Sequence, residues 1–131
     1  MSESAPQAGA DNPAGVPWPI EIRVIDDGHA LKVAFEDGAS FTLPAEYLRV
    51  ESPSAEVQGH HPTQKVTVPG KRAVRIVQVE PVGNYAVRLL FDDRHGTGIY
   101  TWTLLYEYGV EQEQKFGAYL AEMEKRGLSR G

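Results

Sequence analysis

The chain has 131 residues, 41% of them hydrophobic and 24% charged, which predicts a folded protein of about one domain. Its net charge of −5 repels nucleic acid and anionic lipid, so we expect neither as a partner. The absence of cysteine excludes disulfides, thiolate metal sites, iron–sulfur ligation and cysteine nucleophiles.

The N-terminal region predicts neither export nor membrane insertion. No apolar run approaches the roughly 20 residues that a bilayer-spanning helix needs. The first residues also lack the basic and then apolar pattern of a signal peptide, so we expect a cytoplasmic protein. Residues 1–16 are rich in Ala, Gly, Pro and small polar side chains, which predicts a disordered tail. Residues 17–127 are expected to form a single domain, and 128–131 its C-terminal end.

Alternating apolar residues predict three strands in the first half of the ordered chain. They lie within residues 20–24, 31–35 and 41–43, and are separated by the turn signals Asp27-Gly28 and Asp37-Gly38. This pattern indicates a three-stranded antiparallel meander. Pro44 and the following residues, to Leu48, then favour a short helix.

Residues 51–72 contain three prolines and two glycines, which predicts a long loop with a functional or interaction role. Within it, Val66 and Val68 suggest a brief strand. Residues 74–79 and 85–91 then form a predicted hairpin around Gly83-Asn84.

Two helices are expected after the turn-forming residues 92–98. The first begins near Thr101 and ends at Gly109. The second is amphipathic, and its apolar stripe is expected to cover one side of the sheet. The whole pattern predicts an α+β fold of antiparallel hairpins with short helices and a C-terminal amphipathic helix. The residues of that stripe are Phe116, Tyr119, Leu120 and Met123.

The side chains that could carry chemistry do not form a complete catalytic pattern. Asp92 or Asp93 with His95 could form a base and its orienting partner, and Ser52 or Ser54 could be a nucleophile. No G-x-S-x-G turn frames either serine, and Asp-rich and Ser-Pro-Ser segments are typical of ordinary turns. We therefore expect no catalytic residues.

Five aromatic residues lie within 24 positions near the second hairpin. A domain of this size needs large side chains to fill its core, so we expect most of them to be buried and one or two to serve recognition. The five are Tyr85, Tyr100, Trp102, Tyr106 and Tyr108.

Two long runs in the sequence resemble a known family. LRVESPSAEVQGH (residues 48–60) and EPVGNYAVRLLFDDRHGTGIYTW (residues 80–102) are similar to the bacterial DUF971 family, which is related to the N-terminal domain of gamma-butyrobetaine and trimethyllysine hydroxylases. The likeness covers roughly residues 18–108. In those hydroxylases the catalytic iron and 2-oxoglutarate site belongs to a larger C-terminal domain, so the resemblance does not imply oxygenase activity here.

The resemblance also implies where a zinc site would be. In the hydroxylases, three cysteines after a Leu-Arg pair and one later histidine hold a structural zinc ion. The matching positions here are Ser52, Ser54, Val57 and His95. Hydroxyls are poor zinc ligands and valine cannot ligate, so we expect this degenerate site to hold no metal, and we expect no cofactor.

We expect a non-catalytic accessory or interaction domain. The resemblance extends to modules fused to Mrp-like iron–sulfur carriers, which by analogy makes such a carrier, or a metabolic enzyme, the expected protein partner. The alternative is a weak iron or zinc site in which His95 and one loop histidine bind together with Asp92 or Glu56. The residues expected to contact the partner are His60, His61, Arg94, His95, Tyr100 and Trp102.

Overall fold

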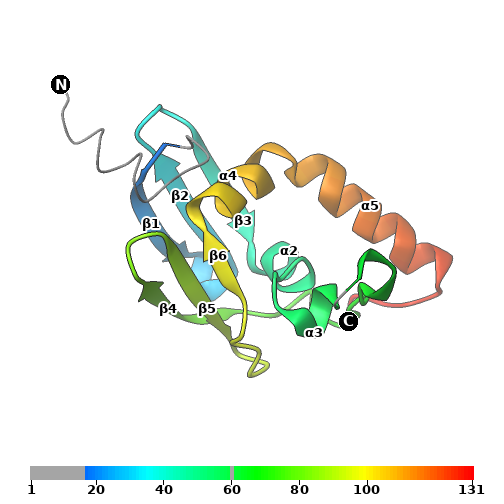
Figure 1. Ribbon diagram of the computed structural model, residues 1–131. Coiled ribbons are helices and arrows are strands. Elements are labelled where there is room, and N and C mark those ends of the chain that lie inside the picture. Colours follow the sequence, from blue (N-terminus) through cyan, green and yellow to red (C-terminus); the bar gives the residue numbers. More distant parts are fainter. Residues whose placement is uncertain (1–16, 60) are drawn as a thin grey trace.

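A computed structural model describes residues 17–59 and 61–131 of the chain. These residues form two three-stranded antiparallel sheets, with helices at one end of the molecule (Figure 1). The predicted α+β class is therefore confirmed. Residues 1–16, for which a disordered tail was predicted, lie outside the described part. No helix within that part is both long and apolar enough to cross a membrane.

The first sheet is the predicted meander. Its strands are β1 (Pro19–Ile25), β2 (Ala30–Phe35) and β3 (Ser40–Pro44), in the order β1-β2-β3. A 3₁₀ turn, η1 (Asp26–Gly28), joins the first two strands. The pairing of β1 with β2 shifts register near the start of β1, and there Ile20 is 70% exposed although the sequence alternation continues through it.

The second sheet contains a strand that the sequence did not predict. The hairpin of β4 (Ile76–Val82) and β5 (Ala86–Phe91) turns at Gly83, which has a φ of +53°. The short β6 (Ile99–Thr101) pairs with the other side of β5, so the order is β4-β5-β6. Only three residues pair, and glycine-rich turn formers precede them, so the sequence carries too little alternation to reveal this strand.

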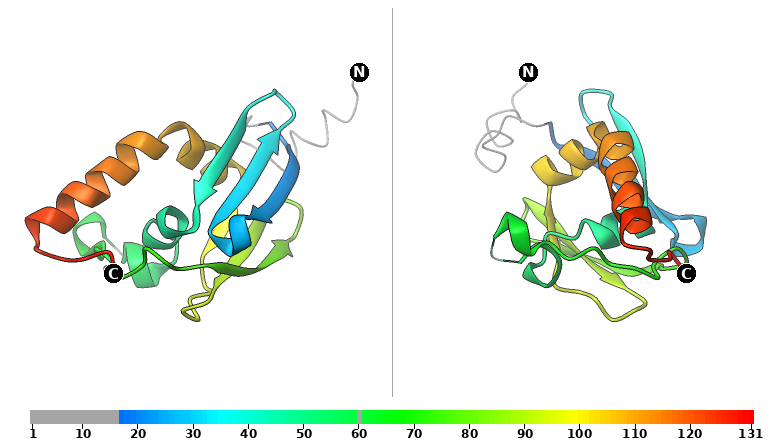
Figure 2. Two further views of the ribbon diagram at one scale, coloured as in Figure 1. Left: turned by 180° about the vertical axis from the view of Figure 1, so that it is seen from behind. Right: turned by 90° about the vertical axis from the view of Figure 1, so that its right-hand side faces the viewer.

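Apolar side chains from both sheets meet in one core. Leu31, Val33 and Phe35, the alternating apolar residues of β2, point into this core as predicted. Residues of β5, β6 and the helix that follows β6 complete it. Figure 2 shows the two sheets from behind and from the side. Each fully buried large apolar side chain stabilises the fold by about 1.5–3 kcal/mol. Residues with no measurable exposure include Leu31, Val33, Leu43, Leu89, Tyr100 and Leu105.

Two short helices flank residues 51–54, where the predicted long loop begins. The first, α2 (Ala45–Val50), was expected from the sequence, whereas the one-turn α3 (Ala55–Gln58) was not. The Ser54 side chain caps α3 by accepting a hydrogen bond from the Glu56 N–H at 3.1 Å. The rest of the loop contains a 3₁₀ turn, η2 (Pro62–Gln64). The predicted strand at Val66 and Val68 is wrong, because this extended segment enters neither sheet of the described residues. The Val66 N–H instead donates to the Val57 carbonyl.

The helix α4 (Trp102–Val110) continues through Gly109, so the predicted stop at that residue is wrong. The glycine is required by packing, since a Cβ there would lie 2.3 Å from the ring of Phe41 on β3. Gly109 therefore lets α4 approach the first sheet closely. The chain then turns and begins α5 (Gln112–Lys125).

The helix α5 does not cover a sheet, contrary to the sequence prediction. It extends beyond the sheets, and its stripe packs on the end of α2 and on Val68 (Figure 1). The C-terminal residues then return: the Gly70 N–H donates to the Ser129 carbonyl, and both nitrogens of the Arg130 fork bind the Glu46 carboxylate at 2.7 and 2.8 Å. The end of the chain thus fastens segment 70–72 to α2.

The two helical glycines give a matched test of this packing. Gly109→Ala forces a methyl group into the Phe41 ring and should destabilise the protein by about 1–3 kcal/mol. Gly117→Ala, on the exposed side of α5 with nothing within 4 Å of its added Cβ, should stabilise it by up to about 1 kcal/mol. Urea unfolding of both variants measures the difference, and equal stabilities would contradict the close approach of α4.

Candidate functional site

A buried hydrogen bond joins two loops that are 43 residues apart in the sequence. Ser52 follows α2, His95 lies between β5 and β6, and the Ser52 Oγ and His95 Nε2 atoms are 2.8 Å apart. Close by, the Ser54 and Thr97 hydroxyl oxygens are 2.6 Å apart. Ser52 is completely buried and His95 is 5% exposed, so these bonds form below the surface.

The other side of the His95 ring fixes its orientation. Its Nδ1 lies 2.9 Å from a carboxylate oxygen of Glu56, whose side chain is 63% exposed. With Nδ1–H donated to Glu56, Nε2 accepts from the Ser52 hydroxyl. The Ser52 oxygen in turn accepts from the Ser54 N–H at 3.2 Å. In this row of side chains, Ser52, His95 and Glu56, both ring nitrogens and the serine hydroxyl therefore have partners when the imidazole is neutral.

Burial and a nearby charge keep the imidazole neutral. Removal from water lowers the pKa of His95, and the positive charge of Arg49 lowers it further, while Glu56 opposes both effects. For the neighbouring Asp93, burial alone would raise the pKa, but hydrogen bonds from Lys71, the His95 N–H and Arg49 bring it to about 2. At neutral pH the loop thus carries an ionised carboxylate beside a neutral histidine.

Two ion pairs and the hydroxyl of Tyr100 hold the Ser52 and His95 loops against the rest of the fold. Arg49 Nε and Lys71 Nζ lie 2.8 and 2.7 Å from the same oxygen of Asp93. The hydroxyl of Tyr100 donates to the Leu48 carbonyl at 2.6 Å, which attaches β6 to α2. Gly98 completes the packing, since a Cβ there would lie 2.5 Å from the Ser52 oxygen.

The row of Ser52, His95 and Glu56 has the spacing of a nucleophile, a base and an orienting carboxylate. The sequence had offered Asp92 or Asp93 for the third role; the structure places Glu56 there instead, with Asp92 bonded to the Arg75 N–H. However, the Ser52 oxygen is fully buried and already accepts a backbone hydrogen bond. A substrate carbonyl has no approach to it, so the geometry supports a structural role.

The residues at the family's zinc positions do not fit a zinc ion. Val57 is 2% exposed and offers no donor atom, and the Ser52 hydroxyl is engaged with His95. Among residues 17–59 and 61–131, no group of three or more His, Asp or Glu side chains is placed to hold a metal. For the alternative site, His61 is exposed and lies near Thr63, whereas His60 lies outside the described residues. Weak metal binding stays a prediction.

The residues predicted to contact a partner separate into two groups. His61 and Arg94 are exposed, and Arg94 occupies a left-handed conformation with φ of +73° at the tip of its turn. His95, Tyr100 and Trp102 are 5%, 0% and 8% exposed. Because their rings are packed inside the fold, these three side chains lie beneath the surface and expose little area that a partner could contact. The Trp102 Nε1–H donates to the Asn84 carbonyl.

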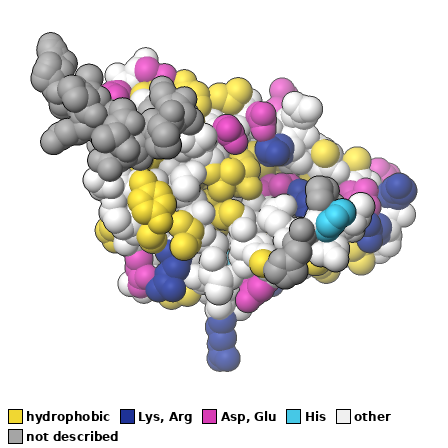
Figure 3. Space-filling view, viewed as in Figure 1, with side chains coloured by type: hydrophobic (Ala, Val, Ile, Leu, Met, Phe, Trp, Pro, Cys, Tyr) yellow, Lys and Arg dark blue, Asp and Glu magenta, His cyan; other side chains and the backbone are white. Residues whose placement is uncertain are grey.

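Exposure also identifies residues that sequence reasoning missed. Ile99 is 41% exposed on β6. Glu56, which the sequence offered only as a ligand of the alternative metal site, has a side chain that is 63% exposed. Of the five aromatic residues near the second hairpin, Tyr85 is the exposed one, at 44%. On the face seen in Figure 3, charges of both signs alternate with hydrophobic groups.

The fold and this loop cluster define a small α+β domain of two sheets with a helical end. A family model for the gamma-butyrobetaine hydroxylase-like, N-terminal domain matches residues 22–106. The chain belongs to this family, which confirms the resemblance found in the sequence. No protein with a curated description matches the chain.

Several solved structures are similar to the chain, among them the following three. Two are NMR solution structures: one is 44% identical with a TM-score of 0.76, covering 88% of this chain and 91% of that one. The other is 41% identical with a TM-score of 0.77, covering 89% and 87%. The third is a crystal structure of a DUF971 protein with unknown function from Acidithiobacillus ferrooxidans, 42% identical with a TM-score of 0.54, covering 66% and 86%.

Removing the central hydrogen bond should destabilise the protein. Ser52→Ala leaves both His95 Nε2 and the Ser54 N–H without a partner inside the fold, at a cost of about 1–3 kcal/mol. Ser40→Ala, at an exposed position at the start of β3, should change stability by less than about 0.5 kcal/mol. Urea unfolding compares the two variants, and an equal loss in both would show that the bond contributes nothing.

Stability should also depend on the protonation of His95. Its pKa is lowered in the folded protein, so below about pH 6.5 the unfolded chain binds more protons than the folded one. The free energy of unfolding should therefore fall as the pH decreases from about 8 to 5. In His95→Gln, which keeps hydrogen-bonding atoms but does not titrate, this fall should be smaller. Parallel pH curves for the two proteins would contradict the assignment.

Proposed function

We propose that this chain is a non-catalytic interaction domain that binds a protein through the two loops joined by Ser52 and His95. The proposed surface, called the paired-loop surface, consists of exposed residues at the start of α3 and along residues 94–99. The residues are Ala55, Glu56, Arg94, Thr97 and Ile99.

The observation that carries this proposal is the rigid support beneath an exposed, chemically mixed surface. The bonds from Ser52 to His95 and from Ser54 to Thr97 join both loops before any partner arrives. A partner therefore meets a preorganised surface and loses less conformational entropy on binding. Glu56 and Arg94 supply charges of opposite sign and Ile99 supplies apolar area, a combination typical of protein interfaces.

Burial argues against catalysis at the same place. The nucleophile-like Ser52 is inaccessible, and the structurally paired His95 has both ring nitrogens engaged. On the paired-loop surface, the Thr97 hydroxyl is paired with Ser54 and the Glu56 carboxylate with His95. The residues thus support recognition better than acid–base or nucleophilic chemistry.

The partner class follows from charge and from the family. A chain of net charge −5 repels nucleic acid, so a protein is the expected ligand. By analogy with the related fused modules, an Mrp-like iron–sulfur carrier is the first candidate and a metabolic enzyme the second. A cytoplasmic location accords with both.

Charge reversal at the turn tip tests the surface. Arg94→Glu should weaken binding to a purified Mrp-like carrier at least tenfold in titration calorimetry, because it replaces an exposed cation of the paired-loop surface by an anion. The matched control is Lys125→Glu, an equal charge change at an exposed position near the end of α5. Thermal unfolding verifies that both variants fold.

Equal binding by wild type, Arg94→Glu and Lys125→Glu would contradict the paired-loop surface. If none of the three binds the carrier, the same comparison is made by quantitative affinity capture from cells, where one co-purifying protein should be depleted by Arg94→Glu and retained by Lys125→Glu. Failure of any protein to show that difference would refute the proposal.

A further inference from the structure

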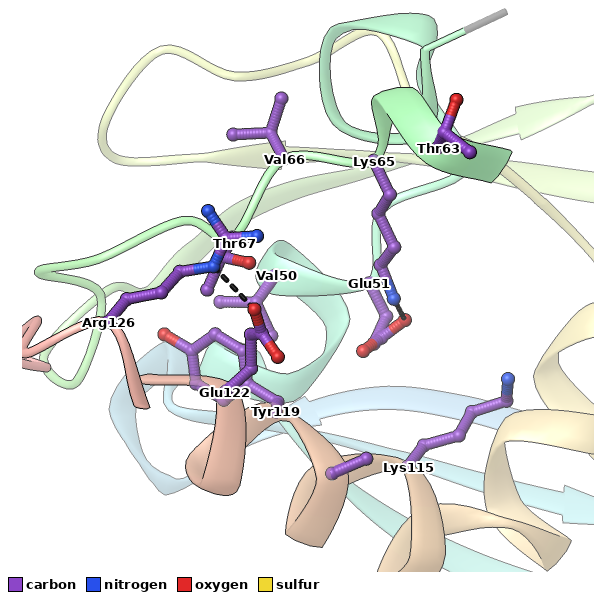
Figure 4. Close-up of a pocket in the computed structure, with 11 residues that line it drawn as sticks. Val50, Glu51, Thr63, Lys65, Val66, Thr67, Lys115, Tyr119, Glu122 and Arg126 are labelled. Carbon is purple, nitrogen blue, oxygen red and sulfur yellow. Dashed lines mark hydrogen bonds and ion pairs between the residues drawn. The ribbon is translucent and has the colours of Figure 1, made fainter. Parts of the chain in front are cut away.

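Two sides of the helix α5 differ in how their charges are satisfied. On the side that faces residues 63–67, Lys65 binds Glu51 and Arg126 binds Glu122, as the dashed lines of Figure 4 show. Both ion pairs lie within the chain, so this side is closed by the protein's own contacts. Another side of α5 carries an apolar groove and unpaired charge.

This groove lies at the bend between α4 and α5 and has a volume of about 530 Å³. Val110, in its lining, is 65% exposed, so the fold leaves most of this apolar side chain in water. Phe116 and Leu120 also line the groove, and both are half-buried. The groove therefore presents accessible apolar surface from two consecutive helices.

Gly117 leaves the middle of the groove open. A Cβ added at this exposed glycine would have no neighbour within 4 Å, and the adjacent Ala118 and Ala121 are small and exposed. The distance between packed helices is about 8–10 Å and depends on the side chains at the contact. Small residues on α5 therefore let a second helix lie close along it.

Two carboxylates mark the ends of this strip. Glu113 lines the groove, and Glu124 follows it by eleven residues, or about three helical turns, so both lie on the same side of α5 and roughly 16 Å apart along its axis. Both are exposed, and the ion pairs of α5 among the described residues involve other carboxylates. Lys125 lies about 100° around the helix from Glu124. Both carboxylates are therefore left without an ion-pair partner among the described residues.

The cations nearest the groove are already bound. Arg130 lies over the Phe116 ring, 5.6 Å from its centre, but both nitrogens of its fork bind Glu46. Lys115 is paired with Glu111. The uncompensated charge at the groove is therefore negative.

From this geometry we infer that the groove binds an amphipathic helix of a partner protein, with cations at both ends of its apolar face. The apolar side chains of that helix cover Val110, Phe116 and Leu120, and its cations, about eleven residues apart, meet Glu113 and Glu124. A second copy of this chain does not match the charges, because antiparallel packing would place Glu113 of one α5 opposite Glu124 of the other. This groove is separate from the paired-loop surface and does not depend on its function.

The test uses the full chain and a fluorescently labelled helical peptide of about 18 residues, with leucines on one face and lysines eleven positions apart. Fluorescence anisotropy should show saturable binding that weakens as salt rises from about 50 to 300 mM. Backbone amide NMR should place the contact at Val110, Glu113, Gly117 and Leu120. A peptide with glutamate for lysine, and one with its leucines spread around the helix, should each bind at least about fivefold more weakly.

A lysine placed in the groove tests its position. Gly117→Lys should weaken binding of the lysine peptide at least about tenfold, because the added side chain occupies the groove and repels the peptide's cations. Ala118→Lys adds the same charge about 100° around the helix, on the side facing residues 63–67, and should stay within about twofold of wild type. Thermal unfolding verifies that both variants fold.

Neutral variants of the carboxylates test the charge match. Glu113→Gln and Glu124→Gln should each weaken binding of the lysine peptide by about twofold to fourfold, as expected for exposed ion pairs. Asp26→Asn, which removes the same charge from the exposed turn η1 outside the groove, should leave binding unchanged.

Several outcomes would overturn the inference. They are the absence of saturable binding of the lysine peptide, equal binding of the glutamate peptide, and unchanged binding in folded Gly117→Lys. Sedimentation that shows self-association of the chain, displaced by the peptide, would identify a second copy as the occupant and would overturn it as well.

Discussion

The hydrogen bond between Ser52 and His95 is the contact on which the candidate interaction surface depends. It connects two turn-rich loops that contribute few apolar side chains of their own to the core. Such segments gain little from hydrophobic burial, so directional polar bonds must hold them. Once Ser52 is fixed, α3 begins at a defined position, and Glu56 reaches the outer nitrogen of the imidazole.

In this chain, hydrogen bonds join the two loops at the positions where the family resemblance implies a zinc site. In the related hydroxylase domains, a metal ion with thiolate ligands is expected at the corresponding positions; here a neutral imidazole, two hydroxyls and a buried valine occupy them. A metal attracts charged ligands strongly, whereas this cluster requires that His95 remain uncharged. The ionised groups are therefore kept to one side, where Arg49 and Lys71 share Asp93. Among the described residues, the hydrogen bonds of Ser52 and His95 and the ion pairs of Asp93 set the geometry of this cluster.

Features determined by neighbouring residues could be predicted from the sequence, and features determined by distant ones could not. The meander and the Gly83-Asn84 hairpin follow from alternation and turn residues, and both are present. The three-residue β6 exists because β5 offers it an edge. Gly109 reads locally as a helix stop but is required by Phe41 across the fold. Likewise His95 and Glu56 were named together only as ligands of an alternative metal site, and the hydrogen bond of His95 to Ser52, 43 positions away, follows from no local pattern.

The contact between Arg130 and Glu46 has a consequence for the order of events during protein synthesis. The two residues are separated by 84 positions, and Glu46 is 6% exposed. When the ribosome has produced both sheets, this carboxylate still lacks its guanidinium partner, so water must continue to solvate it. Contacts between residues so far apart in sequence form late, because closing a long loop costs entropy. The nascent chain should accordingly complete its sheets first and close its helical end only after α5 has been translated.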